Sequence, residues 1–253
     1  NVWCAAGKGT FGTDELVRRI EQYGLVEWST HRTVIVPQLA APGVAAHEVK
    51  KRTGVRVVYG PVRAEDLPAF LEADMKATPE MRRIHFPLLD RLVLAPVELV
   101  FSAKWALLLA ACLLILAGLG KDGYSLARLA RVGSSSVAIF LTTYLGSVVF
   151  TAILLPWLPG RAFWLKGVWI GILFDLGLAL YESFHPGMLG SGCSMAGWCL
   201  LIPAVASFMA MNFTGATTFT SLSGVRRDVR TGAPFQAVAA VFGLVLWLVG
   251  RFV

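Results

Sequence analysis

The chain has 253 residues, of which 56% are hydrophobic, and its mean hydropathy is +0.64. These values exclude an ordinary soluble domain, because globular chains carry fewer apolar residues. The formal net charge is +7, but much of the lysine and arginine flanks long apolar segments, and no alternation of basic and aromatic residues marks a nucleic-acid site. We therefore expect a membrane protein that has no nucleic-acid partner.

The apolar residues are unevenly distributed along the chain. Residues 1 to about 97 carry charges and short amphipathic segments, as in a soluble α/β protein, whereas long apolar runs dominate from Leu99 onward. The sequence starts inside a motif and without a methionine, so we expect further sequence before Asn1. We expect three regions: a soluble domain over residues 1–78, a linker over 79–97 and a transmembrane domain over 98–253.

The first segment, NVWCAAGKGTFG, joins one cysteine to a glycine-rich turn. Gly7 to Gly12 matches the G-x-G-x-x-G fingerprint of dinucleotide-binding folds, but that fingerprint needs a strand before it and an acidic residue about 20 positions later. Glu27 comes before the first convincing strand, which is too early for this role. A nicotinamide-binding protein that uses this turn is therefore an alternative interpretation.

The four cysteines include no C-x-x-C pair, so the sequence does not predict a zinc ribbon or an iron–sulfur cluster built by this chain alone. Cys4 belongs to no recognisable signature of a cysteine nucleophile. Cys193 and Cys199 could form a disulfide on an oxidising side of a membrane, although packing is the favoured interpretation. A single thiolate is enough for a metal that brings its own macrocycle and needs only an axial ligand.

Short helices and strands are expected to alternate after the glycine-rich turn. Thr13, followed by Asp14 and Glu15, predicts the N-cap of a helix that ends at Gly24. We expect strands over 33–37 and 55–60, and helices through 47–52 and over 64–74. This order predicts βαβ units and a parallel sheet, whose ligands would bind beyond the carboxyl ends of the strands, at residues 38–43 and 60–62.

Five segments are apolar enough to cross a bilayer, which takes about 20 residues each. They cover residues 99–119, 136–155, 163–181, 195–213 and 234–249. Asp175 and Pro203 interrupt the third and fourth of them. An intramembrane carboxylate is a functional candidate, but a hydrogen bond from the Thr142–Thr143 pair would give Asp175 a structural role. We expect an anchor rather than a small transporter, because no paired broken helices are indicated.

Loop charge predicts the orientation in the membrane. If the N-terminal side is cytoplasmic, the inner segments hold eight basic residues, namely Arg82, Arg83, Arg91, Arg161, Lys166, Arg226, Arg227 and Arg230. The outer segments then hold four, namely Lys121, Arg128, Arg131 and Arg251. We therefore expect a multi-pass protein of the cell's inner, cytoplasmic membrane, with its soluble domain in the cytoplasm and its C-terminus outside.

The segment NVWCAAGK, continued by GTFGT, resembles the cap-helix motif of the HgcA family, the corrinoid proteins of microbial mercury methylation. The layout, an α/β domain followed by several membrane helices, is similar too, and the family is related to the corrinoid iron–sulfur proteins of the acetyl-CoA pathway. The resemblance implies an α/β corrinoid-binding domain with a parallel sheet of βαβ units, followed by an all-α transmembrane domain of about five helices.

The resemblance also implies a catalytic residue, because Cys4 would be the lower axial ligand to the cobalt of a cobalamin-type corrinoid. The cofactor-binding residues would be Asn1, Val2, Trp3, Cys4, Ala5, Ala6, Gly7, Lys8, Gly9 and Thr10. A thiolate donates strongly to cobalt, and this would favour release of a methyl group to electrophilic Hg(II) as a carbanion or radical equivalent. Residues 38–43 and 60–61 are expected as further corrinoid contacts, from their position alone.

The implied activity is a methyltransferase that passes a methyl group from cobalt to inorganic Hg(II) and forms methylmercury. The methyl donor would come from the folate pathway, and a ferredoxin-like iron–sulfur partner, HgcB, would reduce the cobalt after each turnover. The lack of C-x-x-C in this chain agrees with a separate partner of that kind. Alternatives are a corrinoid methyl carrier for another acceptor in one-carbon metabolism and a nicotinamide-binding membrane protein.

Overall fold

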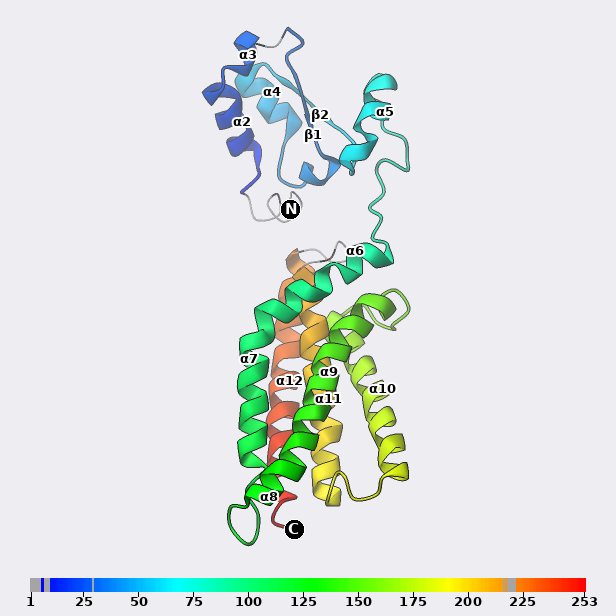
Figure 1. Ribbon diagram of the computed structural model, residues 1–253. Helices are drawn as coiled ribbons and strands as arrows, with labels where there is room; N and C mark the ends of the chain where they lie inside the picture. The colour runs from blue at the N-terminus through cyan, green and yellow to red at the C-terminus, as the bar shows by residue number, and fades with distance from the viewer. Residues whose placement is uncertain (1–5, 7–9, 29, 216, 218–221) are drawn as a thin grey trace. The chain divides into compact units, whose positions relative to one another are not determined.

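The computed structural model divides into two compact units, Asn1–His85 and Phe86–Val253, and each has a hydrophobic core of its own (Figure 1). The structure describes residues 6, 10–28, 30–215, 217 and 222–253. Of the cofactor-binding residues implied by the resemblance, Ala6 and Thr10 are described. The others, Asn1, Val2, Trp3, Cys4, Ala5, Gly7, Lys8 and Gly9, lie outside the described residues.

The first unit contains one βαβ arrangement. Its elements are α2 (Thr13–Gln22), α3 (Leu25–Trp28), β1 (Thr33–Val36), α4 (Ala46–Thr53), β2 (Arg56–Tyr59) and α5 (Leu67–Glu72), with 3-10 turns at Gln38–Ala40 and Ala64–Asp66. β1 and β2 pair in parallel, with Thr33 opposite Arg56 and Val36 opposite Tyr59. The crossover helix α4 packs against both α2 and β2.

Valine and isoleucine side chains from these elements form the core of the first unit. Val17 and Ile20 of α2 are three residues apart and share a helical face, and both are at most 2% exposed. Val49 of α4 and Val36 of β1 are buried beside them, together with Val57 of β2. The residues of this core are therefore those that occupy the periodic apolar positions of the helices and strands.

The sheet of the described residues is small for an α/β domain, and its two strands lie where the sequence predicts them. Within the described residues these strands coincide with the β-branched runs TVIV of β1 and RVVY of β2. The expected parallel pairing is present, but a full α/β corrinoid-binding domain is not shown. The helix expected over 64–74 also differs, since α5 begins at Leu67 behind a 3-10 turn. Pro68 explains this start, because proline suits the first turn of a helix and not its interior.

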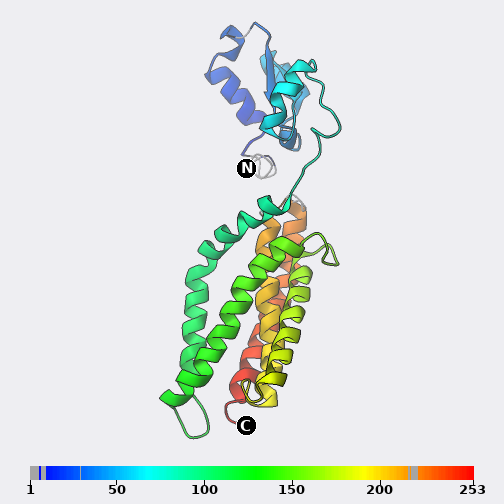
Figure 2. The same cartoon turned by 45° about the vertical axis from the view of Figure 1, so that its right-hand side comes forward.

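The described residues of the second unit form a bundle of five long helices, which run alternately up and down (Figures 1 and 2). They are α7 (Leu94–Leu116), α9 (Ser134–Leu154), α10 (Phe163–Phe184), α11 (Gly192–Asn212) and α12 (Leu222–Val249). All five are long and apolar enough to cross a membrane, which confirms the expected transmembrane helices. α10 and α11 continue through Asp175 and Pro203, so neither residue breaks its span.

Short helices adjoin the first two spans. α6 (Leu88–Leu92) and the first turn of α7 occupy part of the segment 79–97 that was expected to be a linker. Pro96 does not prevent this, because the first helical turn needs no donor from its nitrogen. At the opposite end of the bundle, α8 (Leu126–Arg128) continues through a π-turn at Leu129–Gly133 into α9.

Small residues set the spacing of α10, α11 and α12. A Cβ atom at Gly167 would lie 2.5 Å from the Ala206 carbonyl oxygen of α11, and one at Gly171 would overlap the Pro203 backbone. Gly197 of α11 meets Trp247 of α12 in the same way. Membrane helices associate through such close backbone contacts, since burial from lipid gives little hydrophobic gain. α11 therefore packs tightly between α10 and α12.

Candidate functional site

The described part of the predicted cap segment packs on the loop that follows β1. Ala6 is 5% exposed. A Cβ atom at Gly43 would lie 2.9 Å from the Ala6 carbonyl oxygen and 2.7 Å from the Phe11 carbonyl oxygen. Two backbones come this close only where one of them carries no side chain. Gly43 thus lets the chain at Ala6 and Phe11 lie directly against the strand-end loop.

Thr13 joins these two segments by hydrogen bonds. Its backbone N–H donates to the Gly43 carbonyl oxygen over 3.0 Å, and its hydroxyl oxygen accepts from the Ala45 N–H over 2.9 Å. Thr13 was expected to cap α2, but Gly12 occupies the N-cap position and provides no side chain. The threonine hydroxyl therefore bonds to the loop and does not cap the helix. This bond holds the segment before α2 beside residues 43–45.

The loop after β1 and the loop after β2 lie at the same edge of the sheet. β1 and β2 are parallel, so residues 38–43 and 60–61 both follow carboxyl ends. The Tyr59 hydroxyl, at the end of β2, donates to the Val44 carbonyl oxygen over 2.5 Å. Ligands of parallel sheets bind at this edge. The segment that continues from the NVWCAAGK motif is therefore attached where a sheet of this kind takes its ligand.

The donor atom of the predicted cobalt site is the Cys4 thiolate, and Cys4 lies outside the described residues. Within the described ranges, no three His, Cys, Asp or Glu side chains are grouped as metal ligands. Comparison of the chain with protein families, with characterised proteins and with solved structures found no match. The features of this region that bear on function are thus the small residues at the sheet edge and the motif itself.

Asp175 of α10 is half-buried, and its Oδ1 atom is buried without a hydrogen-bond partner among the described residues. The Thr143 hydroxyl donates to the Ile139 carbonyl oxygen of its own helix over 2.9 Å. The described residues therefore do not form the expected hydrogen bond from the Thr142–Thr143 pair to Asp175. Asp175 stays the candidate polar group inside the membrane.

The cysteines of the second unit are free thiols. Cys112 and Cys199 are exposed on the helix surfaces, and Cys193 is half-buried. Cys193 and Cys199 lie six residues apart in α11, which separates their Cα atoms by about 9 Å along the axis and prevents a disulfide within the helix. The helical spacing therefore argues against the disulfide, and the exposure of Cys199 shows that this thiol does not pack in the core of the described residues.

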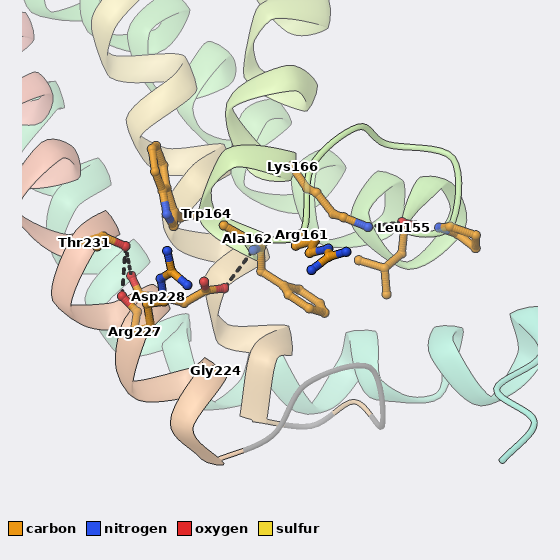
Figure 3. A pocket seen from close by; sticks show the side chains of 12 residues that line it. Leu155, Arg161, Ala162, Trp164, Lys166, Gly224, Arg227, Asp228 and Thr231 are labelled. Carbon is orange, nitrogen blue, oxygen red and sulfur yellow. Dashed lines mark hydrogen bonds between the residues drawn. The ribbon is translucent and has the colours of Figure 1, made fainter.

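A cavity of about 1080 Å³ lies at the end of the bundle where α7, α10 and α12 begin (Figure 3). It was not anticipated from the sequence, because its basic residues were considered only as signals of orientation. Arg161, Lys166 and Arg227 line it together with the buried carboxylate of Asp228. The signal that could have located it is a cluster of basic residues at two segments, 161–166 and 226–230, which lie at the end of the bundle where α10 and α12 both begin (Figure 1).

Proposed function

We propose that this chain is a membrane-anchored, corrinoid-dependent methyltransferase that converts inorganic Hg(II) to methylmercury. The observation that carries the proposal is the motif NVWCAAGK-GTFGT at residues 1–13. Its layout supports the proposal, because a βαβ unit is followed by five helices able to cross a membrane. The attachment of Ala6 beside Gly43, at the ligand-binding edge of the sheet, supports it as well.

The composition of the motif suits a large flat ring. Alanine and glycine fill positions 5, 6, 7 and 9 of the motif, and small side chains allow a backbone to lie close to a planar ligand. The donor set fits too, since one thiolate is sufficient for cobalt that is already held by a macrocycle. Residues 38–43 and 60–61 would line the same edge.

Cys4 is the residue on which the proposed chemistry depends. A bound corrinoid would supply the cobalt from which a methyl group is transferred to Hg(II). Cys4 would have to be a thiolate to hold the metal, and its sulfur would donate electron density to that metal, as cysteine thiolates do in haem proteins. That donation favours transfer to an electrophile such as Hg(II). A folate-pathway methyl donor and the ferredoxin-like partner HgcB complete the proposal.

The first test is a visible absorption spectrum, with cobalt content, of the full-length protein reconstituted with corrinoid under anaerobic conditions. The variant is Cys4→Ala and its matched control is Cys112→Ala, which removes an exposed thiol of α7. We expect the cobalt bands of Cys4→Ala to differ from those of wild type, and methylmercury formation with the ferredoxin-like partner to be abolished. The control should match wild type in both measurements.

Other outcomes would redirect the proposal in defined ways. Identical spectra in wild type and Cys4→Ala would remove Cys4 from the cobalt. Corrinoid binding without methylmercury formation would favour a methyl carrier for another acceptor. If neither protein binds corrinoid, the alternative in which the GKGTFG turn at residues 7–12 binds a nicotinamide cofactor would be favoured.

A further inference from the structure

The cavity at the end of the membrane bundle has walls from three helices. The end of α9 and the loop after it contribute Leu155 and Arg161, the first turn of α10 contributes Trp164 and Lys166, and α12 contributes Arg227. Figure 3 shows Arg161 and Lys166 on one wall and Arg227, beside Asp228 and Thr231, on the other. Residues from distant parts of the sequence thus bring basic side chains around one space.

The lining of this cavity is positively charged. It holds three cations, Arg161, Lys166 and Arg227, against one carboxylate, Asp228, and three minus one leaves a formal charge of +2. Asp228 is 7% exposed, and its Oδ2 atom accepts a hydrogen bond from the Phe163 N–H over 2.7 Å. Among the described residues neither arginine forms a salt bridge. The positive charge is therefore left for an anion.

The walls are held in place by contacts that do not use the arginines. The Lys166 ammonium donates to the Leu155 carbonyl oxygen over 2.6 Å, a neutral acceptor that leaves its charge uncompensated. A Cβ atom at Gly232 of α12 would lie 2.7 Å from the Trp164 ring, so Trp164 packs flat against α12 at this glycine. With the bond between Asp228 and Phe163, these contacts fix the start of α10 against α12.

One side of the cavity continues into a lipid-facing surface. Arg227, Thr231 and Phe235 follow each other at four-residue intervals and therefore share a face of α12. Phe235 is 66% exposed and stacks on Trp164 with 5.8 Å between ring centroids. Trp157, in the loop before α10, is 71% exposed, as expected of tryptophan at the level of lipid headgroups. The charged cavity thus adjoins an apolar surface, just as the charged headgroup of a phospholipid adjoins its acyl chains.

We propose that this cavity binds a phosphate group, with the headgroup of an anionic phospholipid as its source. One guanidinium group can donate two parallel hydrogen bonds to two oxygens of a phosphate, and a lysine ammonium adds a positive point charge. Basic pockets between membrane helices bind anionic headgroups by this chemistry. The acyl chains would lie along Phe235 and the apolar face of α12 below it. This inference does not depend on the proposed methyl transfer.

The test uses the full chain purified in an uncharged detergent and titrated separately with phosphatidylglycerol, phosphatidylcholine and inorganic phosphate. The variant is the pair Arg161→Gln and Arg227→Gln. Its control is Arg82→Gln with Arg83→Gln, which removes the same charge from two exposed arginines of the first unit. The apparent Kd is obtained from the rise of the thermal unfolding midpoint with ligand concentration.

We expect phosphatidylglycerol to stabilise wild type and the control, and to bind the variant at least about tenfold more weakly, because two charge-assisted contacts are lost. Phosphatidylcholine should have little effect. Stabilisation by inorganic phosphate at the same sites would keep the phosphate site and make a free phosphate its source. Equal binding of phosphatidylglycerol to wild type and variant would overturn the proposal. If the double variant does not fold, Arg161→Gln alone tests it, since Arg161 is an exposed loop residue.

Discussion

A methyl group added at Gly43 would meet backbone atoms of Ala6 and Phe11, and backbone cannot move aside as the end of a side chain can. We expect Gly43→Ala to lower the free energy of unfolding of the first unit by about 1–3 kcal/mol, as overpacking does elsewhere. Hydrogen exchange around residues 6–13 should accelerate in the variant, because this segment is displaced from the loop. Urea unfolding of the full chain measures the first effect.

Gly54→Ala is the control for this prediction. Gly54 ends α4 with φ +71° and has no atom within 4 Å of an added Cβ. Alanine there costs about 1 kcal/mol through its backbone conformation alone, and exchange at residues 6–13 should not change. Equal exchange in both variants would show that Gly43 does not hold the cap segment.

Glu15 predicts a dependence of stability on pH. The hydrogen bond from Arg19, over 2.8 Å, and a further one from Arg18 lower the pKa of the Glu15 carboxyl below its ordinary value of 4.5. A lowered folded-state pKa contributes stability above the ordinary value, and this contribution is lost as pH falls through the folded pKa. Glu15→Gln should therefore lose less stability than wild type on acidification below about pH 4.5.

The measurement is urea unfolding at a series of acidic pH values, with Glu48→Gln as the control. Glu48 is a partly exposed carboxylate of α4 that forms no salt bridge among the described residues. The effect at Glu15 should be small, because exposed ion pairs contribute little. Parallel pH profiles for wild type and Glu15→Gln would contradict the role assigned to the two arginines.

The secondary structure elements were predictable wherever local sequence decides them. The two strands followed from their β-branched residues, and α2 from its acidic first turn and apolar spacing. α10 and α11 were expected to be weak because of Asp175 and Pro203, yet both are continuous. Their continuity depends on packing between helices, and that packing is not a property of either segment alone.

Gly167 and Gly171 form a helix-packing motif that is present in the sequence but was not predicted from it. They form a G-x-x-x-G pair on α10, the spacing that brings membrane helices close together. Gly171→Ala should destabilise the bundle by about 1–3 kcal/mol, because the new methyl group overlaps the Pro203 backbone of α11. Thermal unfolding in detergent measures this loss.

Gly177→Ala is the matched control on the same helix. Gly177 has nothing within 4 Å of an added Cβ, so alanine should be neutral there or stabilise the helix by up to about 1 kcal/mol. A loss as large as that of Gly171→Ala would mean that glycine is needed along α10 for a reason other than contact with α11. A neutral Gly171→Ala would contradict the close packing itself.

The sequence predicts two regions of different character because hydropathy changes along the chain near residue 97. The candidate sites were predictable only in part. The motif at residues 1–8 is visible in the sequence, whereas the approach of Ala6 to Gly43 joins positions 37 residues apart. The basic cavity joins residues 161–166 to 227–231. Contacts of this kind arise from tertiary packing, and no local pattern specifies them.

The orientation of the bundle links the two proposals. Five spans place the start of α7 and the C-terminus on opposite sides of the membrane (Figure 1), and the loop charges predict a cytoplasmic N-terminal side. Alkaline phosphatase, which is active only outside the cytoplasm, should be active when fused after Gly123, Gly187 or Val253. It should be inactive when fused after Gly160, in the loop between α9 and α10.

A green fluorescent protein fused at the same positions should give the opposite pattern, because it fluoresces when it folds in the cytoplasm. The predicted orientation puts Arg161 and Arg227 at the cytoplasmic leaflet, where anionic headgroups attract basic groups. It would also place the first unit in the same compartment as the proposed ferredoxin-like partner and folate-pathway donor. The reverse fusion pattern would separate the first unit from both proposed partners, and would leave the phosphate site to be tested with lipids of the outer leaflet.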